Sequence, residues 1–356
     1  MINRLINKWK SMKLLRKIAT ILIFSSLIFL ISNCRLISYG IQQGVGQIRM
    51  VNNAVPISDL MKNPLISDSL KQKFLLVEEI KKFAFDSLGL NPSKNYNTFY
   101  DQKGKPILWI TVACEAYEMK AYTWKFPIVG RVPYKGYFKK QDAVDEAEKL
   151  KAMGYDSRVG TVSAWSTLGF FKDPILSDML DQSEGQIARL IIHELTHSTL
   201  YVKGNAQFSE NLATFVGDEG AKFYIQQKYG LNSLQYREYV GELSDVEKFS
   251  SHILKGANLL DSLYRTFSEE LAGDIKKEKK FQLIKQIMND LDTITFYIPS
   301  KFPKLQNPNS LPNNAFFIGY ITYHKDQNIF MKEFQSKFNS DFPSYLYYLK
   351  SQFDAV

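Results

Sequence analysis

Two histidines and a glutamate close together in the chain have the spacing of a metal site. His193, Glu194 and His197 stand in the order His-Glu-x-x-His, inside an apolar run at 187–200 that predicts a helix. Four residues along a helix bring both imidazoles onto one face, with Glu194 at its edge. Two neutral imidazoles so placed can bind zinc, and the neighbouring carboxylate can take a proton from a metal-bound water. The pattern indicates metal-assisted hydrolysis.

The same spacing also occurs by chance on ordinary helices, where a histidine on an apolar face is more often a hydrogen-bonded core residue than a ligand. The chain has four histidines in all, and two of them lie in this segment. The glutamate between them stands where the chemistry requires it. The sequence therefore favours one zinc ion per chain over a pair of core histidines.

A zinc hydrolase needs three protein ligands and one open position, so a third ligand must come from another segment. No third histidine follows at the short spacing of the metzincins. Glu210 is the candidate, early in a second predicted helix that ends near Gly230. Ala213 and Gly217, three and seven residues further on, form a stripe of small residues that would let this helix approach the first one closely.

Two alternatives to Glu210 as a ligand stay open. Glu210 could be a solvated glutamate favoured by the positive end of the helix dipole. Asp218 and Glu219 are competing carboxylates, but they lie two turns or more further along the same helix. That position favours the surface, or a contact that orients a ligand imidazole.

An ordered set of segments at 39–47, 124–138, 165–174, 193–217 and 313–315 resembles a family of bacterial lipoproteins named putative aminopeptidases, of the gluzincin type of zinc metallopeptidase. This resemblance spans nearly the whole chain after residue 33. It implies a zincin-like core, with His193, His197 and Glu210 as zinc ligands and Glu194 as catalytic base. One departure is Ser209, where the family pattern has Asn; it leaves the ligand in place and changes a hydrogen bond beside it.

The N-terminus has the pattern of a secretory leader. Residues 1–17 contain six basic residues and no acidic one, and 18–32 is an apolar stretch of fifteen residues. That stretch is shorter than the about 20 residues of a membrane-spanning helix. Residues 31–34 resemble a lipobox, so we expect 1–33 to be a lipoprotein signal peptide and Cys34 to carry a lipid anchor. Because Asn33 is unusual before the cysteine, a retained transmembrane anchor is the alternative. In both cases the chain would face the periplasm of a bacterial cell envelope.

The charge of the chain belongs largely to this leader. The formal net charge is +9, from 45 basic and 36 acidic residues. Removing the six leader bases leaves 39 and 36, or +3. No basic stripe interleaved with aromatic residues follows, so the sequence gives little support to nucleic-acid binding. With Cys34 lipid-modified, Cys114 remains alone and no intramolecular disulfide is available.

We expect an α+β fold that is mostly helical, with a small sheet before the zinc helix. Residues 34–356 are long enough for one metallopeptidase-like domain, with an N-terminal α/β part to about 175 and a helical catalytic and C-terminal part after it. Hydrophobic periodicity predicts helices at 67–88, 141–153, 233–271, 280–292, 327–338 and 343–353, and strands at 107–113 and 155–164.

Substrate-binding candidates come from two sources. Residues 163–170 precede the zinc helix, where gluzincins use an edge strand to align an extended peptide; a core strand or turn before Pro174 is an equal alternative. Several side chains further along are able to stabilise an oxyanion. The candidates for substrate binding are Trp165, Ser166, Gly169, Tyr201, Asn314 and Tyr323. Tyr134 and other aromatic residues could line a pocket, although aromatic residues at this density are more often core.

The sequence thus predicts a zinc-dependent peptidase acting on peptides in the cell envelope, and the resemblance favours an aminopeptidase. An aminopeptidase also needs an acidic group for the free N-terminal amine, and the sequence identifies none. An envelope endopeptidase therefore stays open. So does a lipid-anchored binding or assembly protein with a structural or inactive zinc site. The oligomeric state is open as well.

Overall fold

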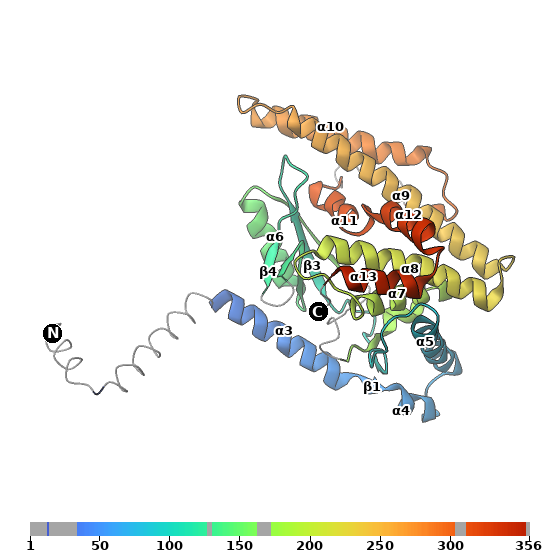
Figure 1. Ribbon diagram of the computed structural model, residues 1–356. Coiled ribbons are helices and arrows are strands. Elements are labelled where there is room, and N and C mark those ends of the chain that lie inside the picture. Colours follow the sequence, from blue (N-terminus) through green and yellow to red (C-terminus); the bar gives the residue numbers. More distant parts are fainter. Residues whose placement is uncertain (1–12, 14–33, 127–129, 162–171, 303–310, 354–356) are drawn as a thin grey trace. The chain divides into compact units, whose positions relative to one another are not determined.

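The computed structural model describes residue 13 and residues 34–126, 130–161, 172–302 and 311–353 (Figure 1), with backbone only for 34–37. The chain divides into two units, Met1–Asn52 and Asn53–Val356. Helix α3 (Cys34–Asn53) forms nearly all of the described part of the first unit. No helix within the described residues combines the length and apolarity needed to cross a bilayer. The predicted leader lies outside them, apart from Lys13.

The second unit is α+β and mostly helical, as predicted. Instead of one small sheet, its described strands form three. In the first sheet, strand β1 (Val55–Pro56) pairs with β2 (Thr98–Tyr100), which pairs with β8 (Ile175–Leu176). In the second sheet, β3 (Trp109–Cys114) lies between β6 (Tyr134–Tyr137) and β7 (Asp156–Thr161). In the third sheet, β4 (Trp124–Phe126) pairs with β5 (Gly130–Val132).

The helices of this unit vary widely in length. They are α4 (Ile57–Lys62), α5 (Asp68–Asp86), α6 (Lys140–Ala152), α7 (Glu184–His197), α8 (Ala206–Tyr229), α9 (Leu234–Arg265), α10 (Gly273–Asn289), α11 (Asn314–His324), α12 (Gln327–Phe338) and α13 (Phe342–Gln352), with short 3₁₀-helices at Ser177–Asp181, Asp290–Thr293 and Pro299–Lys301.

The antiparallel sheet β6-β3-β7 lies between two helices (Figure 1). On one face, the Thr111 hydroxyl of β3 donates to the Ala143 carbonyl of α6 at 2.8 Å. On the other face, the Arg158 guanidinium of β7 lies over the Phe316 ring of α11, 5.4 Å from its centroid. Cys114 at the end of β3 is buried and free, and burial raises the pKa of its thiol to about 12.

The core of the helical part is the pair α7 and α8 (Figure 1). Helix α7 packs with its apolar face on α8, and α5 covers another side of it. Helices α9 and α11 pack against α8 and against each other. Helix α11 was not predicted, because apolar residues surround it and give no amphipathic period. Its position between α8, α9 and the sheet explains why it is apolar all round.

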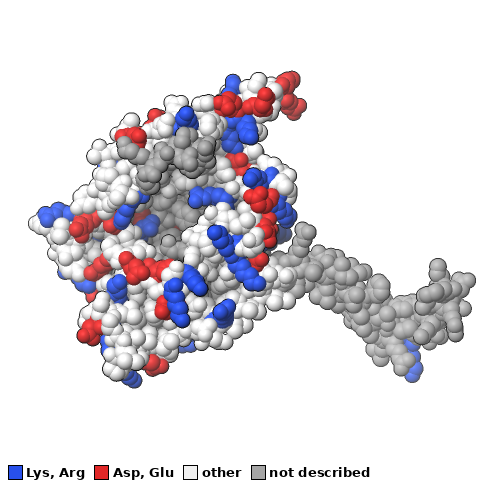
Figure 2. Space-filling model, turned by 180° about the vertical axis from the view of Figure 1, so that it is seen from behind, with Lys and Arg blue, Asp and Glu red and all other residues white. Residues whose placement is uncertain are grey.

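Helix ends depend on capping residues more than on periodicity. Helix α7 begins at Glu184, earlier than the predicted 187, because the Ser183 side chain accepts a hydrogen bond from the Gln186 amide. Helix α10 begins at Gly273, seven residues before the predicted 280, so the charged run 276–280 is helical, and its last residue, Lys280, is mostly buried and pairs with Asp156. Over the face seen in Figure 2, basic side chains lie next to acidic ones, and several border a hollow.

Candidate active site

Helix α7 presents His193 and His197 side by side. The two ring centroids are 4.9 Å apart and the rings are nearly perpendicular, at 85°. His197 is the last residue of the helix, and the chain turns away at Ser198. Both imidazoles therefore lie at one end of a buried helix, with His193 more exposed than His197.

Helix α8 brings Glu210 to the same point. The Asn205 side chain caps this helix by accepting a hydrogen bond from the Phe208 amide. Ser209, the departure from the family pattern, accepts a hydrogen bond from the Val202 amide at 3.0 Å and donates to the Asn205 carbonyl. Ser209 thus stabilises the loop between the two helices, and the neighbouring carboxylate of Glu210 remains oriented toward α7.

The three side chains converge on a small volume. Glu210 Oε2 lies 3.6 Å from His193 Nε2 and 3.4 Å from His197 Nε2. One ligand atom from each residue lies within 4.8 Å of the other two. Among the described residues this is the one group of three or more His, Cys, Asp or Glu side chains with metal-site spacing. The predicted helix-to-helix convergence is therefore present in the structure.

Charge complementarity holds this group together. Burial alone would raise the pKa of the Glu210 carboxyl, but the charge of His197 and the close approach of both imidazoles hold it well below its usual range. Burial lowers the pKa of His197, but the charge and close approach of Glu210 together with the charge of Glu194 more than offset this, so the net shift is upward. Glu210 is thus ionised at neutral pH, the form in which a carboxylate binds a metal.

The competing carboxylates on α8 have other partners. Asp218 accepts a hydrogen bond from Arg189 of α7, and Glu219 pairs with Lys222 at 3.1 Å. Neither belongs to the group of metal-site spacing. Of the three acids weighed from the sequence, only Glu210 faces the imidazoles.

The close approach of α7 and α8 depends on Gly217. A Cβ added there would lie 2.9 Å from the Arg189 carbonyl oxygen and 3.2 Å from His193 Cβ, against the backbone that carries the first imidazole. We therefore expect Gly217→Ala to lower the free energy of unfolding by about 1–3 kcal/mol and to weaken zinc binding. Urea denaturation and zinc titration measure the two effects.

A matched substitution on the same helix is Gly220→Ala. Its Cβ would meet side-chain atoms of Leu88 and Ile192 at 2.8 and 3.2 Å, and these can shift more easily than a backbone carbonyl. It should cost less stability and leave zinc affinity unchanged. Equal effects of the two substitutions on zinc affinity would contradict the role given to Gly217.

Three tyrosines surround the group. The Tyr134 hydroxyl donates to Glu210 Oε1 at 3.1 Å, so this carboxylate uses its second oxygen for the hydrogen bond. Burial and then the charge of Glu210 raise the pKa of Tyr201 to about 12. Burial and the charges of Glu210 and Glu194 raise the pKa of Tyr323. All three phenols therefore keep their protons at neutral pH and can donate hydrogen bonds.

Glu194 lies beside the group without belonging to it. Its side chain is nearly buried, with 9% of its surface exposed. Its carboxylate makes no hydrogen bond or ion pair with any other residue in the described ranges 34–126, 130–161, 172–302 and 311–353. Its charge contributes to the raised pKa of Tyr323, after burial and Glu210. This carboxylate therefore lies close to the three-residue group and has no hydrogen-bond or ion-pair partner among the described residues.

A model of a protein family described as "Putative aminopeptidase" matches residues 38–353. The chain belongs to this family. Membership supports a peptidase and a peptide as its substrate. No curated protein and no solved structure matches the chain.

The six candidates for substrate binding in this family member fall into three groups. Trp165, Ser166 and Gly169 lie outside the described residues. Tyr201 and Tyr323 lie near Glu210, as the pKa effects indicate. Asn314 instead fixes the start of α11, because its side chain accepts from Tyr264 and donates to the Glu115 and Ala116 carbonyls. The geometry gives Asn314 a structural contact and no support for substrate binding.

Two side chains enter the site that sequence reasoning did not assign to it. Tyr134 was considered only as a possible pocket or core aromatic residue, and its contact with Glu210 joins positions 76 residues apart. His324 lies near the same place, although a single histidine outside the His-Glu-x-x-His pattern carries no local signal of a site. Burial lowers its pKa to about 4, and charges near it include Asp218, Arg189 and His193. Membership of Tyr134 in the resembling segment 124–138 was the one available signal.

Proposed function

We propose that this chain is a zinc-dependent peptidase, an aminopeptidase of the bacterial cell envelope. The observation that carries this proposal is the convergence of two Nε2 atoms and one carboxylate oxygen from adjacent helices. Two imidazoles and one carboxylate are a ligand set that zinc uses in hydrolases. The family supplies the reaction class, because its description is that of an aminopeptidase.

The residues fit a zinc ion chemically. His193, His197 and Glu210 would hold it through three ligand atoms, which leaves a coordination position for water or substrate. The other oxygen of Glu210 accepts from Tyr134, and such a contact orients a ligand carboxylate. When bound, zinc supplies Lewis-acid polarisation of the scissile carbonyl and lowers the pKa of water to about 7.

The protein's own groups would move the protons. Glu194 is buried and has no hydrogen-bond or ion-pair partner among the residues that the structure describes, so it can accept the proton of the attacking water and then deliver it to the leaving amine. The protonated hydroxyls of Tyr201 and Tyr323 can donate to the oxyanion that develops on the substrate carbonyl. The site thus contains a base and hydrogen-bond donors around one group of metal ligands.

Removal of metal tests this function directly. Treatment with 1,10-phenanthroline should abolish hydrolysis of a mixed peptide library, and added Zn²⁺ should restore it, because the proposed chemistry requires the ion. Mass spectrometry follows the products from peptides with free and with acetylated N-termini. Cleavage of the first residue from free N-termini alone supports an aminopeptidase, and internal cleavage of acetylated peptides supports an endopeptidase. Full hydrolysis by metal-free protein would contradict the proposal.

The proposed location rests on Cys34 as the site of a lipid anchor. In bacteria that express the full chain, Cys34→Ala should move the protein from the membrane fraction to the soluble fraction and abolish incorporation of labelled fatty acid. Cys114→Ala is the matched control, because this buried cysteine should have no part in anchoring. Unchanged membrane attachment of Cys34→Ala would instead favour a retained transmembrane helix.

A further inference from the structure

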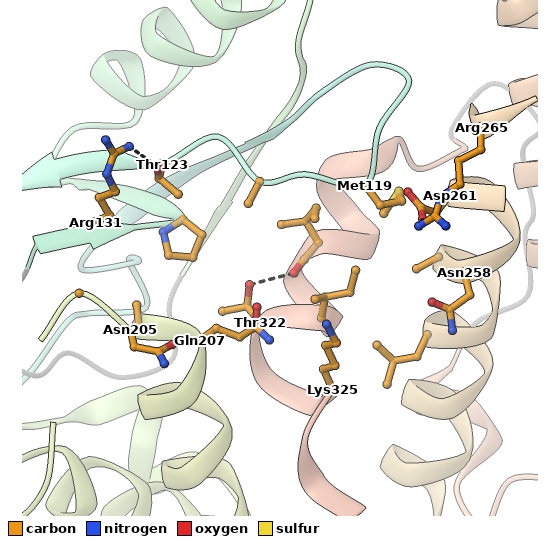
Figure 3. A pocket seen from close by; sticks show the side chains of 18 residues that line it. Met119, Thr123, Arg131, Asn205, Gln207, Asn258, Asp261, Arg265, Thr322 and Lys325 are labelled. Atoms are coloured by element: carbon orange, nitrogen blue, oxygen red, sulfur yellow. Dashed lines mark hydrogen bonds and ion pairs between the residues drawn. The ribbon is translucent and has the colours of Figure 1, made fainter. Parts of the chain in front are cut away.

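A cavity of about 690 Å³ opens between four elements of the second unit (Figure 3). The hairpin β4–β5 and the start of α8 form one side, and α9 forms the other. The C-terminal half of α11 lies between them. The cavity is large enough for a side chain or a short stretch of peptide.

The cavity shares its walls with the candidate active site. Gln207 lines it, and Glu210 lies three residues further along α8, on the same helix face. Pro133 lines it, and the next residue is Tyr134, whose hydroxyl reaches Glu210. Thr322 also lines it, and its carbonyl accepts a hydrogen bond from Asn211, the residue after Glu210. Three segments that line the cavity thus also carry, or bind, residues at or next to Glu210.

Asn211 fixes this geometry. Its amide donates to the Thr322 carbonyl at 2.6 Å, and its oxygen accepts from the Asp326 amide at 2.9 Å. The residue next to Glu210 thus binds two points, the last turn of α11 and the residue that precedes α12. The position of Lys325, between these two points, is set by the same helix that carries Glu210.

Positive charge predominates around the cavity. Three lining residues are cationic, Arg131, Arg265 and Lys325, and one is acidic, Asp261. Figure 3 shows the three cations on different elements. Asp261 pairs with Arg265 at 2.5 Å, one helical turn away. One cation is neutralised in this way, and two remain.

The other two cations lack a counter-charge. Arg131 donates a long hydrogen bond of 3.4 Å to the neutral Thr123 hydroxyl. Lys325 makes no hydrogen bond or ion pair with any residue that the structure describes. Both side chains are exposed and line the cavity, Arg131 from the hairpin and Lys325 from the C-terminal end of α11. Two unpaired cations about one cavity favour an anionic guest and disfavour an amine.

We propose that this cavity binds a carboxylate of the peptide substrate, either an acidic side chain or the C-terminal carboxylate. The proposal rests on the proposed function, because it assigns the cavity to the substrate of the neighbouring site. Arg131 and Lys325 supply the charge, and the neutral amides of Gln207 and Asn258 offer further donors from α8 and α9. A free N-terminal amine would be repelled here, so the amine end of a substrate must lie elsewhere.

Binding measured without turnover tests the proposal. Zinc-loaded Glu194→Gln protein is dialysed to equilibrium against a mixed tetrapeptide library, and mass spectrometry measures the retention of each peptide. The library contains Glu and Gln counterparts, each with a free and an amidated C-terminus. Loss of retention on changing Glu to Gln identifies an acidic side chain as the ligand, and loss on amidation identifies the C-terminus.

Charge substitutions locate the binding site. Lys325→Gln and Arg131→Gln should each weaken retention of the carboxylate-bearing peptides about three- to tenfold. Asp261→Asn should strengthen it, because it removes the one acid of the cavity and releases Arg265. Lys332→Gln, an equal charge change at an exposed α12 position that does not line the cavity, should have no effect.

Three results would overturn the proposal: no retention of any peptide, retention independent of both carboxylates, or equal weakening by Lys332→Gln and Lys325→Gln. Failure of the proposed function looks different. In that case wild-type protein leaves the same library intact, while carboxylate-dependent retention persists and remains sensitive to Arg131 and Lys325.

Discussion

Replacing Glu194 by Gln is expected to lower kcat by a factor of about 10²–10⁴ while one zinc ion per chain remains bound. The reason is the position of Glu194, next to His193 in the chain and outside the group of metal ligands. Its carboxylate has no partner among the described side chains, so the substitution breaks no observed hydrogen bond. An amide of the same shape occupies the site but cannot accept a proton. Peptide hydrolysis and zinc content, measured on the same sample, check both parts.

The matched control is Glu184→Gln on the same helix. The Glu184 carboxylate bonds to Tyr224, Tyr229 and Lys228 at the far end of α7, away from both histidines. Its loss can reduce stability but should leave kcat nearly unchanged. A Glu194→Gln protein that keeps wild-type turnover would exclude Glu194 as the base, and one that loses its zinc would show a ligand role instead.

Replacing Glu210 by Ala should weaken zinc binding by more than about 100-fold, a larger effect than loss of a residue that only orients a ligand. The substitution removes the only carboxylate in the group of metal-site spacing found among the described residues. It also leaves the Tyr134 hydroxyl without its acceptor, and an unsatisfied buried donor costs about 1–3 kcal/mol. Both zinc content and hydrolysis should fall to background.

Glu219→Ala is the control for Glu210→Ala, because it removes a carboxylate from the same helix that pairs with Lys222. Zinc binding should be unchanged in this variant. Tight stoichiometric zinc in Glu210→Ala, together with loss of zinc in Glu219→Ala, would reverse the assignment of the third ligand.

The metal-free protein should show the charge coupling between Glu210 and His197 as a pH dependence. The pKa of His197 is raised on folding, so its contribution to stability is complete below its ordinary value of 6.5 and is lost as pH rises through the folded pKa. The pKa of Glu210 is lowered on folding, so its contribution is present above 4.5 and is lost as pH falls. With EDTA present, the stability difference between wild type and Glu210→Ala should therefore be largest between these two values.

The convergence of His193, His197 and Glu210 could be predicted from the sequence because its signals are local. The spacing of His193 and His197 determines a shared helix face without knowledge of the rest of the fold. The prediction of Glu210 required one further inference. The small residues Ala213 and Gly217 on the same helix allow close helix packing, which is a general rule. The contact at Gly217 shows why that step succeeded, since any side chain there would press on the Arg189 carbonyl.

Other parts of the site depend on tertiary contacts that leave no local pattern. Tyr134 reaches Glu210 from a strand 76 residues earlier, and apart from its place in the resembling segment 124–138 nothing marks it as more than a core aromatic residue. Helix α11 has no amphipathic period, so periodicity does not predict it, and with it the approach of Lys325 to the cavity. Asn314, favoured by chemistry and resemblance, has its hydrogen-bonding atoms occupied by the turn after β3 and by Tyr264 of α9.

The central claim is that two imidazoles and one carboxylate hold a single zinc ion. X-ray absorption spectroscopy at the zinc edge of the purified protein tests it most directly. We expect one zinc per chain with nitrogen and oxygen ligands at about 2.0–2.2 Å, a contribution from two imidazoles, and no sulfur shell near about 2.3 Å. The imidazole signal should disappear in a His193→Ala, His197→Ala protein. Absence of stoichiometric zinc, or a zinc environment unchanged by those substitutions, would contradict the claim.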